Sequence, residues 1–135
     1  MTVEGLVVCA SHRDPRQTMD ALVAAVERRG MSVMARIDHA AAAAQVGMQL
    51  RPTDVLVFGN PTAGTPLMDA VPSIGIDLPL KALVWQDEEG RTFLSYNDPA
   101  YLARRHGLGD QAKAGIDAMT GALKAIAAKA TTATA

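Results

Sequence analysis

The sequence predicts a single α+β domain, with helices on one face of a largely antiparallel sheet. Strand-like and helix-like segments alternate as far as residue 71, but two strand-like segments then follow each other directly over 81–97. A strict alternation would favour a parallel sheet, and these adjacent strands argue against one. The chain has 135 residues, with no internal repeat and no linker, so we expect one domain over 1–135 built around one core.

The first three predicted elements are a strand, a helix and a strand. Residues 4–11 form an apolar run that is typical of a strand. The helix predicted over 14–30 has Pro15 at its first position and Gly30 after its last turn. The strand predicted over 31–39 alternates, and one parity contains Val33, Ala35, Ile37 and His39.

The next three elements surround a glycine loop. An alanine run over 40–47 predicts a short helix, and residues 54–60 are apolar on both parities, which indicates a strand covered on both faces. A short helix is predicted over 65–71. Thr65 is a suitable N-cap for this helix and Pro66 a suitable first residue.

The second half predicts a hairpin and two helices. If the hairpin over 81–97 turns at Glu89 and Gly90, Trp85 faces Leu94 and Leu83 faces Tyr96, which gives one strongly apolar face. Residues 98–107 form a short helix between Asp98, an N-cap, and Gly107, a C-terminal cap. The last helix starts near residue 110, and its small, polar end at about 130–135 is expected to fray.

Composition excludes several classes of function. The net charge is −1 and no cluster of basic residues occurs, so we expect neither nucleic acid nor a membrane as a partner. The first residues lack a basic segment and a long apolar run, which predicts a cytoplasmic protein. The histidines, His12, His39 and His106, are dispersed and the chain has one cysteine, so we expect no metal and no cofactor. Whether the histidines meet in space is open at this stage.

The stretch FGNPTAGT, residues 58–65, raises the question of a phosphate-binding loop. Gly59 and Gly64 have the spacing of a Walker loop, but Thr65 stands where that loop needs a lysine. We therefore expect no nucleoside triphosphate. A helix starting after Gly64 could still offer free N–H groups to an anion or carbonyl. The alternative is a capped turn with no ligand.

Several stretches together resemble the domain-of-unknown-function 302 family. They are IDHAAAA, PTDVLVFGNPTAGTPLM, DLPLKALVW and YNDPAYLA, in this order, and the resemblance covers about residues 5–108. It implies a fold similar to the TATA-box-binding-protein-like class, with the order β-α-β(4)-α and short helical insertions. It implies homodimers as well, and no established activity.

Candidate site residues lie at the predicted strand ends. His39 is a candidate acid–base group with Asp38 beside it; alternatively, His39 is structural and Asp38 caps the alanine helix. The other candidates are ligand-binding residues near the glycine loop, namely Asn60, Gly64, Thr65, Lys81, Tyr96 and Asn97. Capping, packing and solvation explain several of these equally well.

These observations leave three hypotheses for the function. The first is a domain that binds a small polar or anionic ligand in a cleft at the strand ends. The second is an enzyme that uses His39. The third is a structural or partner-binding homodimeric module.

Overall fold

The computed structural model of the chain describes residues 2–133 and confirms the α+β class. One sheet has the strand order β1-β5-β4-β3-β2, and every neighbouring pair is antiparallel. The strands are β1 (Leu6–Ser11), β2 (Ser32–Asp38), β3 (Thr53–Gly59), β4 (Leu80–Gln86) and β5 (Thr92–Asn97). The helices are α1 (Pro15–Arg28), α2 (His39–Gln45), α3 (Pro61–Ala70), α4 (Pro99–His106) and α5 (Lys113–Thr131), with 3₁₀ turns η1 (Pro72–Ile76) and η2 (Asp110–Ala112).

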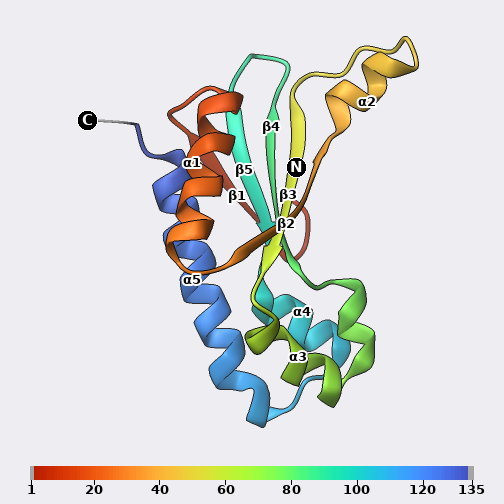
Figure 1. The fold of residues 1–135 in the computed structure, drawn as a ribbon, viewed down its shortest axis with the longest axis vertical. Helices are drawn as coiled ribbons and strands as arrows, with labels where there is room; N and C mark the ends of the chain where they lie inside the picture. Colours follow the sequence, from red (N-terminus) through yellow and green to blue (C-terminus); the bar gives the residue numbers. More distant parts are fainter. Residues whose placement is uncertain (1, 134–135) are drawn as a thin grey trace.

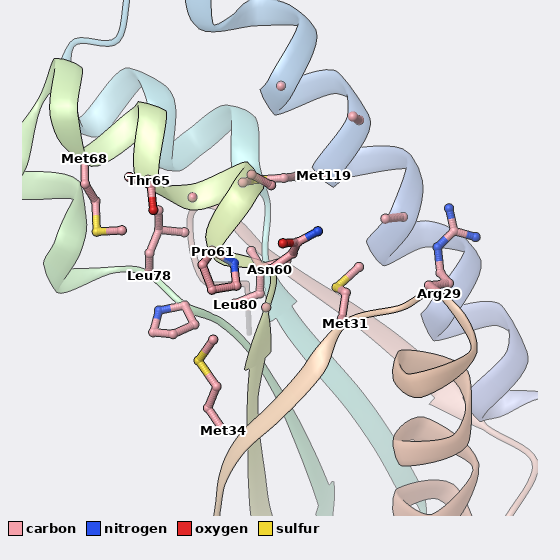
Figure 2. A pocket seen from close by; sticks show the side chains of 17 residues that line it. Arg29, Met31, Met34, Asn60, Pro61, Thr65, Met68, Leu78, Leu80 and Met119 are labelled. Atoms are coloured by element: carbon pink, nitrogen blue, oxygen red, sulfur yellow. The ribbon is translucent and has the colours of Figure 1, made fainter.

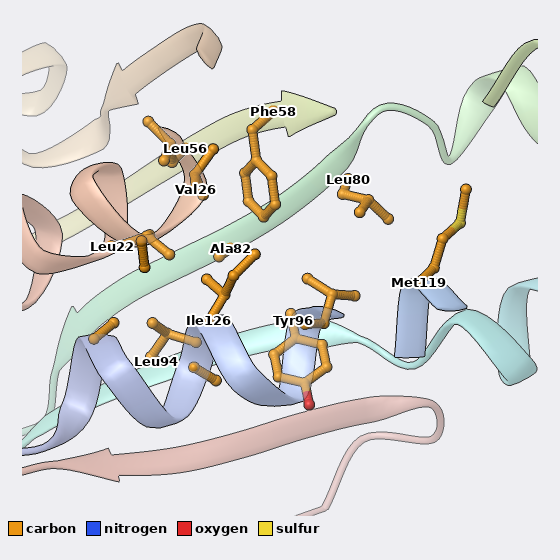
Figure 3. Close-up of a cluster of buried hydrophobic side chains, with 14 of the residues drawn as sticks. Leu22, Val26, Leu56, Phe58, Leu80, Ala82, Leu94, Tyr96, Met119 and Ile126 are labelled. Atoms are coloured by element: carbon orange, nitrogen blue, oxygen red, sulfur yellow. The ribbon is translucent and has the colours of Figure 1, made fainter. Parts of the chain in front are cut away.

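Helices α1 and α5 cover one face of the sheet, while α3 and α4 lie beyond one end of it (Figure 1). The core lies between the sheet and these two long helices (Figure 3). Its fully buried members include Leu22 and Val26 of α1, Leu56 and Phe58 of β3, and Ile126 of α5. The buried apolar residues of both helices therefore face the sheet.

Within residues 2–133, no long helix covers the opposite face of the sheet (Figure 1). Register places one row of residues across the strands on this face, in the order Ile37, Val55, Leu83, Ser95 and Val8. Trp85 and Phe93 stack beside this row, with ring centroids 4.7 Å apart. We call the apolar members the uncovered face; they are Val8, Ile37, Val55, Leu83, Trp85 and Phe93. Val8 is 49% exposed and Ile37 is 46% exposed, so apolar surface is left in solvent.

Side-chain caps hold several helix ends, and the caps predicted for α4 are among them. Asp14 and Gln17 form a reciprocal capping box at the start of α1. Asp98 accepts a hydrogen bond from the backbone of Ala100 at the start of α4, and Gly107 adopts a left-handed conformation after that helix.

Helix α3 starts four residues earlier than predicted, and Thr65 is not its cap. Asn60 is the N-cap, Pro61 is the first helical residue, and both Thr65 and Pro66 lie inside the helix. The sequence offers two successive pairs of a capping residue and a proline, and the chain uses the first. The longer helix brings the buried Leu67 against the core.

The hairpin turn differs from the prediction by one residue. Trp85 pairs with Phe93 and Leu83 pairs with Ser95, rather than with Leu94 and Tyr96. The backbone of Asp87 bonds that of Arg91, so the loop has three residues and ends with Gly90 at a φ of 78°. A three-residue loop with a left-handed glycine is a common hairpin connection, and it shifts the register.

Strand β2 does not keep the predicted parity. A register shift between Val33 and Ala35 places Val33 opposite Phe58, whose side chain is buried beneath the helices. Ala35 and Ile37 lie opposite Val57 and Val55, whose side chains point to the opposite face of the sheet. His39 is the first residue of α2 and not the end of the strand.

The C-terminal helix also extends further than expected. It runs through Thr131, which is buried, so residues 130 and 131 are helical where the sequence predicts a frayed tail. Residues 134 and 135 of that predicted tail lie outside the described residues.

Candidate functional site

A pocket of about 430 Å³ lies at the sheet end where β3 finishes and β4 starts (Figure 2). Residues before and within β2, the helix α3, the loop before β4 and the helix α5 form its walls. The lining side chains used below are Arg29, Met31, Met34, Asn60, Gly64, Thr65, Met68, Leu78, Ala118 and Met119. The pocket therefore occupies the strand ends where the sequence predicts a cleft.

Small residues on α5 create the space. Gly115, Ala118 and Ala122 recur at helical spacing and line the pocket. On the facing α3, a methyl group at Gly64 would lie 3.8 Å from both Leu78 and Met68, so the glycine adds to the free volume. Larger side chains on either helix would fill the cavity.

Four of the chain's seven methionines line the pocket, so its surface is mainly apolar. Met31 and Met34 come from the β2 side, Met68 from α3 and Met119 from α5 (Figure 2). Methionine side chains are flexible and polarizable, and they adapt to the shape of an apolar ligand. The sequence analysis names no methionine as a site residue; their high number beside only 4% aromatic residues was the available signal.

The start of α3 offers no free N–H group to an anion, which favours the capped-turn alternative for the glycine loop. Pro61 has no N–H. The N–H of Thr62 bonds the Asn60 side chain at 3.0 Å, and those of Ala63 and Gly64 bond the Asn60 carbonyl at 3.0 and 3.1 Å. Asn60 thus satisfies the groups that a phosphate cradle would need.

The polar groups at the pocket are side chains. Asn60 and Thr65 are exposed and belong to α3 and its cap, while Arg29 follows the last turn of α1. Arg29 forms no ion pair with any residue between 2 and 133. Its guanidinium is therefore a free cation beside an apolar cavity.

The other three predicted ligand residues do not line this pocket. Tyr96 is 7% exposed in the core, where burial raises the pKa of its phenol, with smaller contributions from Cys9 and Asp98. Asn97 is exposed at the end of β5. Lys81 donates to the carbonyls of Asp77 and Pro79, at 3.3 and 3.4 Å, and so braces the loop before β4.

Asp38 and His39 lie at the opposite end of β2 from the pocket. The Asp38 carboxylate accepts a hydrogen bond of 2.9 Å from the Ala41 backbone, so it caps α2. His39 is exposed. The structure does not bring these two residues to Asn60, Gly64 or Thr65.

A second polar cluster joins η1 to α4, and the sequence analysis did not foresee it. His106 Nε2 lies 2.5 Å from Asp77 Oδ2, and His106 Nδ1 lies 2.8 Å from Ser73 Oγ. Arg105 donates to the same Asp77 oxygen at 2.7 Å. The three residues of a serine–histidine–aspartate relay are present, although 33 positions separate Ser73 from His106 and no sequence motif connects them.

The electrostatics of this cluster favour an ionised Asp77. Burial opposes ionisation of this carboxyl, but the hydrogen bond from His106 and the charge and hydrogen bond of Arg105 outweigh it and lower the pKa of Asp77. None of these four side chains lines the pocket, although Leu78, the next residue after Asp77, does. We therefore assign the cluster a structural role: it clamps the pocket wall to α4.

No group of three histidine, cysteine, aspartate or glutamate side chains within residues 2–133 is placed to hold a metal ion. The three histidines lie apart within one chain. The backbone of His12 bonds Thr131 at the end of α5, His39 starts α2, and His106 ends α4.

Comparisons with known proteins give a family and a fold. The sequence model for the domain of unknown function DUF302 matches residues 7–126. The crystal structure of an uncharacterized conserved DUF302 protein from Bacillus stearothermophilus is similar, with a TM-score of 0.83. The alignment covers 95% of this chain and 99% of that one at 17% identity. That likeness supports the fold alone.

Curated relatives extend well beyond this chain. Proteins named fluoride-specific ion channel FluC 1, from Brucella suis biovar 1 and Brucella abortus biovar 1, are both 44% identical over 115 residues. The match spans 85% of this chain but only 45% and 43% of those proteins. Among residues 2–133 of this chain, no helix is long and apolar enough to cross a membrane.

Proposed function

The chain belongs to the DUF302 family, and we propose that it is a binding domain that holds a small molecule in the pocket between α3 and α5. The pocket itself carries the proposal. Its volume of about 430 Å³ falls within the range of about 300–1,000 Å³ that is usual for ligand sites. It also combines a mainly apolar wall with the polar side chains of Asn60 and Thr65, the arrangement that orients a ligand.

A fluorescence titration with 1-anilinonaphthalene-8-sulfonate, an apolar probe with one anionic group, tests this proposal. We expect saturable binding to the wild-type protein. Ala118→Phe places a ring in the pocket and should remove the binding. Ala125→Phe is the matched control, because Ala125 is exposed on the same helix and does not line the pocket. Equal binding by both variants would refute the assignment of the site.

We also propose that the domain forms a homodimer through the uncovered face. A sheet with apolar side chains on both faces needs a packing partner on each face, and helices α1 and α5 cover only one of the two faces. The exposed apolar side chains of Val46, Met48 and Leu50 lie in the segment after α2, which rises on the side of the sheet away from α1 and α5 (Figure 1).

The area of the uncovered face indicates that a second copy would contact both this face and the segment after α2. Five strands at about 4.8 Å spacing and six residues at about 3.3 Å each give a sheet of roughly 480 Å². A stable interface needs about 800 Å² from each partner. The sheet alone falls short, and the segment after α2 supplies further apolar area.

Light scattering tests the dimer directly. We expect twice the chain mass for the wild type at high micromolar concentration. Val8→Lys combined with Ile37→Lys puts charges on the uncovered face, at positions exposed enough to keep the fold, and should give a monomer. Ile76→Lys is the control, because Ile76 is 75% exposed and lies on η1, away from that face. A monomeric wild type would end this proposal.

A docking domain for a membrane channel is the second candidate. The observation that favours it is the match to less than half of proteins named as fluoride channels, by a chain without a membrane-spanning helix among its described residues. The part of the Brucella suis protein outside the match can be expressed alone in detergent and mixed with this chain. Co-elution would support docking, and separate elution would refute it.

A further inference from the structure

We infer that the pocket takes an organic anion with an unbranched apolar tail, such as a medium-chain carboxylate. This inference rests on the proposed function, since it names the class of ligand for the same pocket. It is carried by the placement of one unpaired cation at one end of the pocket and of flexible apolar side chains along the rest.

Arg29 and Asn60 would bind the head group. Arg29 is the only charged residue among those that line the pocket in the described part of the chain. A guanidinium binds a carboxylate through two parallel hydrogen bonds, and it carries its charge at every physiological pH. The exposed Asn60 carboxamide has one oxygen occupied by the Thr62 backbone, but its NH₂ group is still able to donate.

The tail would run away from Arg29 along the methionines. Figure 2 places Arg29 at one end of the pocket and Met68 and Leu78 at the other, with Met31 and Met119 between them. A compact polar ligand would leave these apolar walls in water, whereas an unbranched chain covers them. Methionines adjust to chains of slightly different length, so we expect neighbouring chain lengths to bind as well.

The pocket offers one positive charge, which favours a head group with a single negative charge. A single arginine neutralises one negative charge, and no other charged residue among 2–133 lines the pocket to add a second. The N–H groups at the start of α3 are already bonded, so they give no support to a phosphate chain. A carboxylate therefore fits this site better than a di- or triphosphate.

Calorimetric titrations with decanoate, decan-1-ol and butyrate, all below aggregating concentrations, separate the head from the tail. We expect decanoate to bind at least about tenfold more tightly than decanol, which lacks the charge, and than butyrate, which lacks the tail. Arg29→Ala should weaken decanoate about tenfold and leave decanol unchanged. Arg28→Ala is the matched control, because Arg28 is exposed on the last turn of α1 and does not line the pocket.

The outcomes distinguish this inference from the proposed function. If decanol binds as tightly as decanoate, or if Arg29→Ala has no effect, the anionic class is wrong while the pocket stands as a binding site. If all three probes fail to bind and Ala118→Phe does not alter the naphthalene sulfonate signal, the proposed function fails as well. Vesicles of phosphatidylglycerol should not displace decanoate; displacement would point to a lipid surface and overturn the inference.

Discussion

Replacing the cap of α3 should have the opposite effect to replacing the threonine inside it. The Asn60 side chain accepts a hydrogen bond of 3.0 Å from the Thr62 backbone, and Asn60→Ala leaves that N–H to water. Loss of such a cap costs about 1 kcal/mol, within a range of roughly 0.5–2 kcal/mol. Thr65 is exposed in the helix interior and makes no side-chain hydrogen bond to any residue in 2–133. Thr65→Ala should therefore stabilise the protein by up to about 0.7 kcal/mol, because alanine has the higher helix propensity.

Urea denaturation followed by circular dichroism measures both changes as shifts in the midpoint at constant slope. Asn60→Asp is the control, since aspartate caps a helix as well as asparagine does. A cost of about 1 kcal/mol for Thr65→Ala, together with no cost for Asn60→Ala, would contradict this account. It would mean that the helix begins at Thr65 in solution.

The remaining predictions concern four other positions. His39→Ala should change the free energy of unfolding by less than about 1 kcal/mol in urea, because the side chain is exposed and starts a short helix. Calorimetry with MgATP should show no micromolar binding, because the loop lacks the lysine of a Walker site. Gly5→Ala should destabilise strongly in a thermal melt, since φ is 75° and a methyl group would clash with the Tyr101 ring, whereas Gly121→Ala meets nothing within 4 Å and should not destabilise. Asp77→Asn should lose less stability in acid than the wild type does. Folding lowers the pKa of Asp77, so its charge stabilises the fold above the unfolded pKa of about 3.9. This contribution is lost as the pH falls through the pKa of the folded state. An unchanged acid profile in that variant would refute the clamp.

The fold was predictable because its signals are local. Two helices begin at local caps, α1 after Asp14 and α4 after Asp98. The side of α1 that is buried is the one that carries Leu22 and Val26. The errors arose where local signals compete. Asn60-Pro61 and Thr65-Pro66 are both good helix starts, and the chain uses the first, with the Asn60 side chain bonded to the backbone of Thr62.

The site was predictable only in part, because its residues meet through the fold. Asn60, Gly64 and Thr65 are close in sequence to a recognisable glycine loop, so they could be named. Arg29 and Met119 are far apart in the chain and have no motif that connects them. The same applies to the Ser73, Asp77 and His106 cluster, whose members lie in elements joined only by tertiary contacts.

The central strands carry more apolar residues than one layer of helices requires. A sheet covered on one face needs apolar side chains only at alternate positions. In β3, Leu56 and Phe58 are buried beneath the helices, yet Val55 and Val57, which alternate with them, are apolar too and only half-buried. Leu83 of β4 repeats this pattern on the same face. Polar residues would be tolerated equally well at these positions if they faced water. Their apolar character therefore argues that another surface, which residues 2–133 do not supply, packs against them. A second copy of the chain supplies such a surface, because a two-fold interface uses the same patch on both copies.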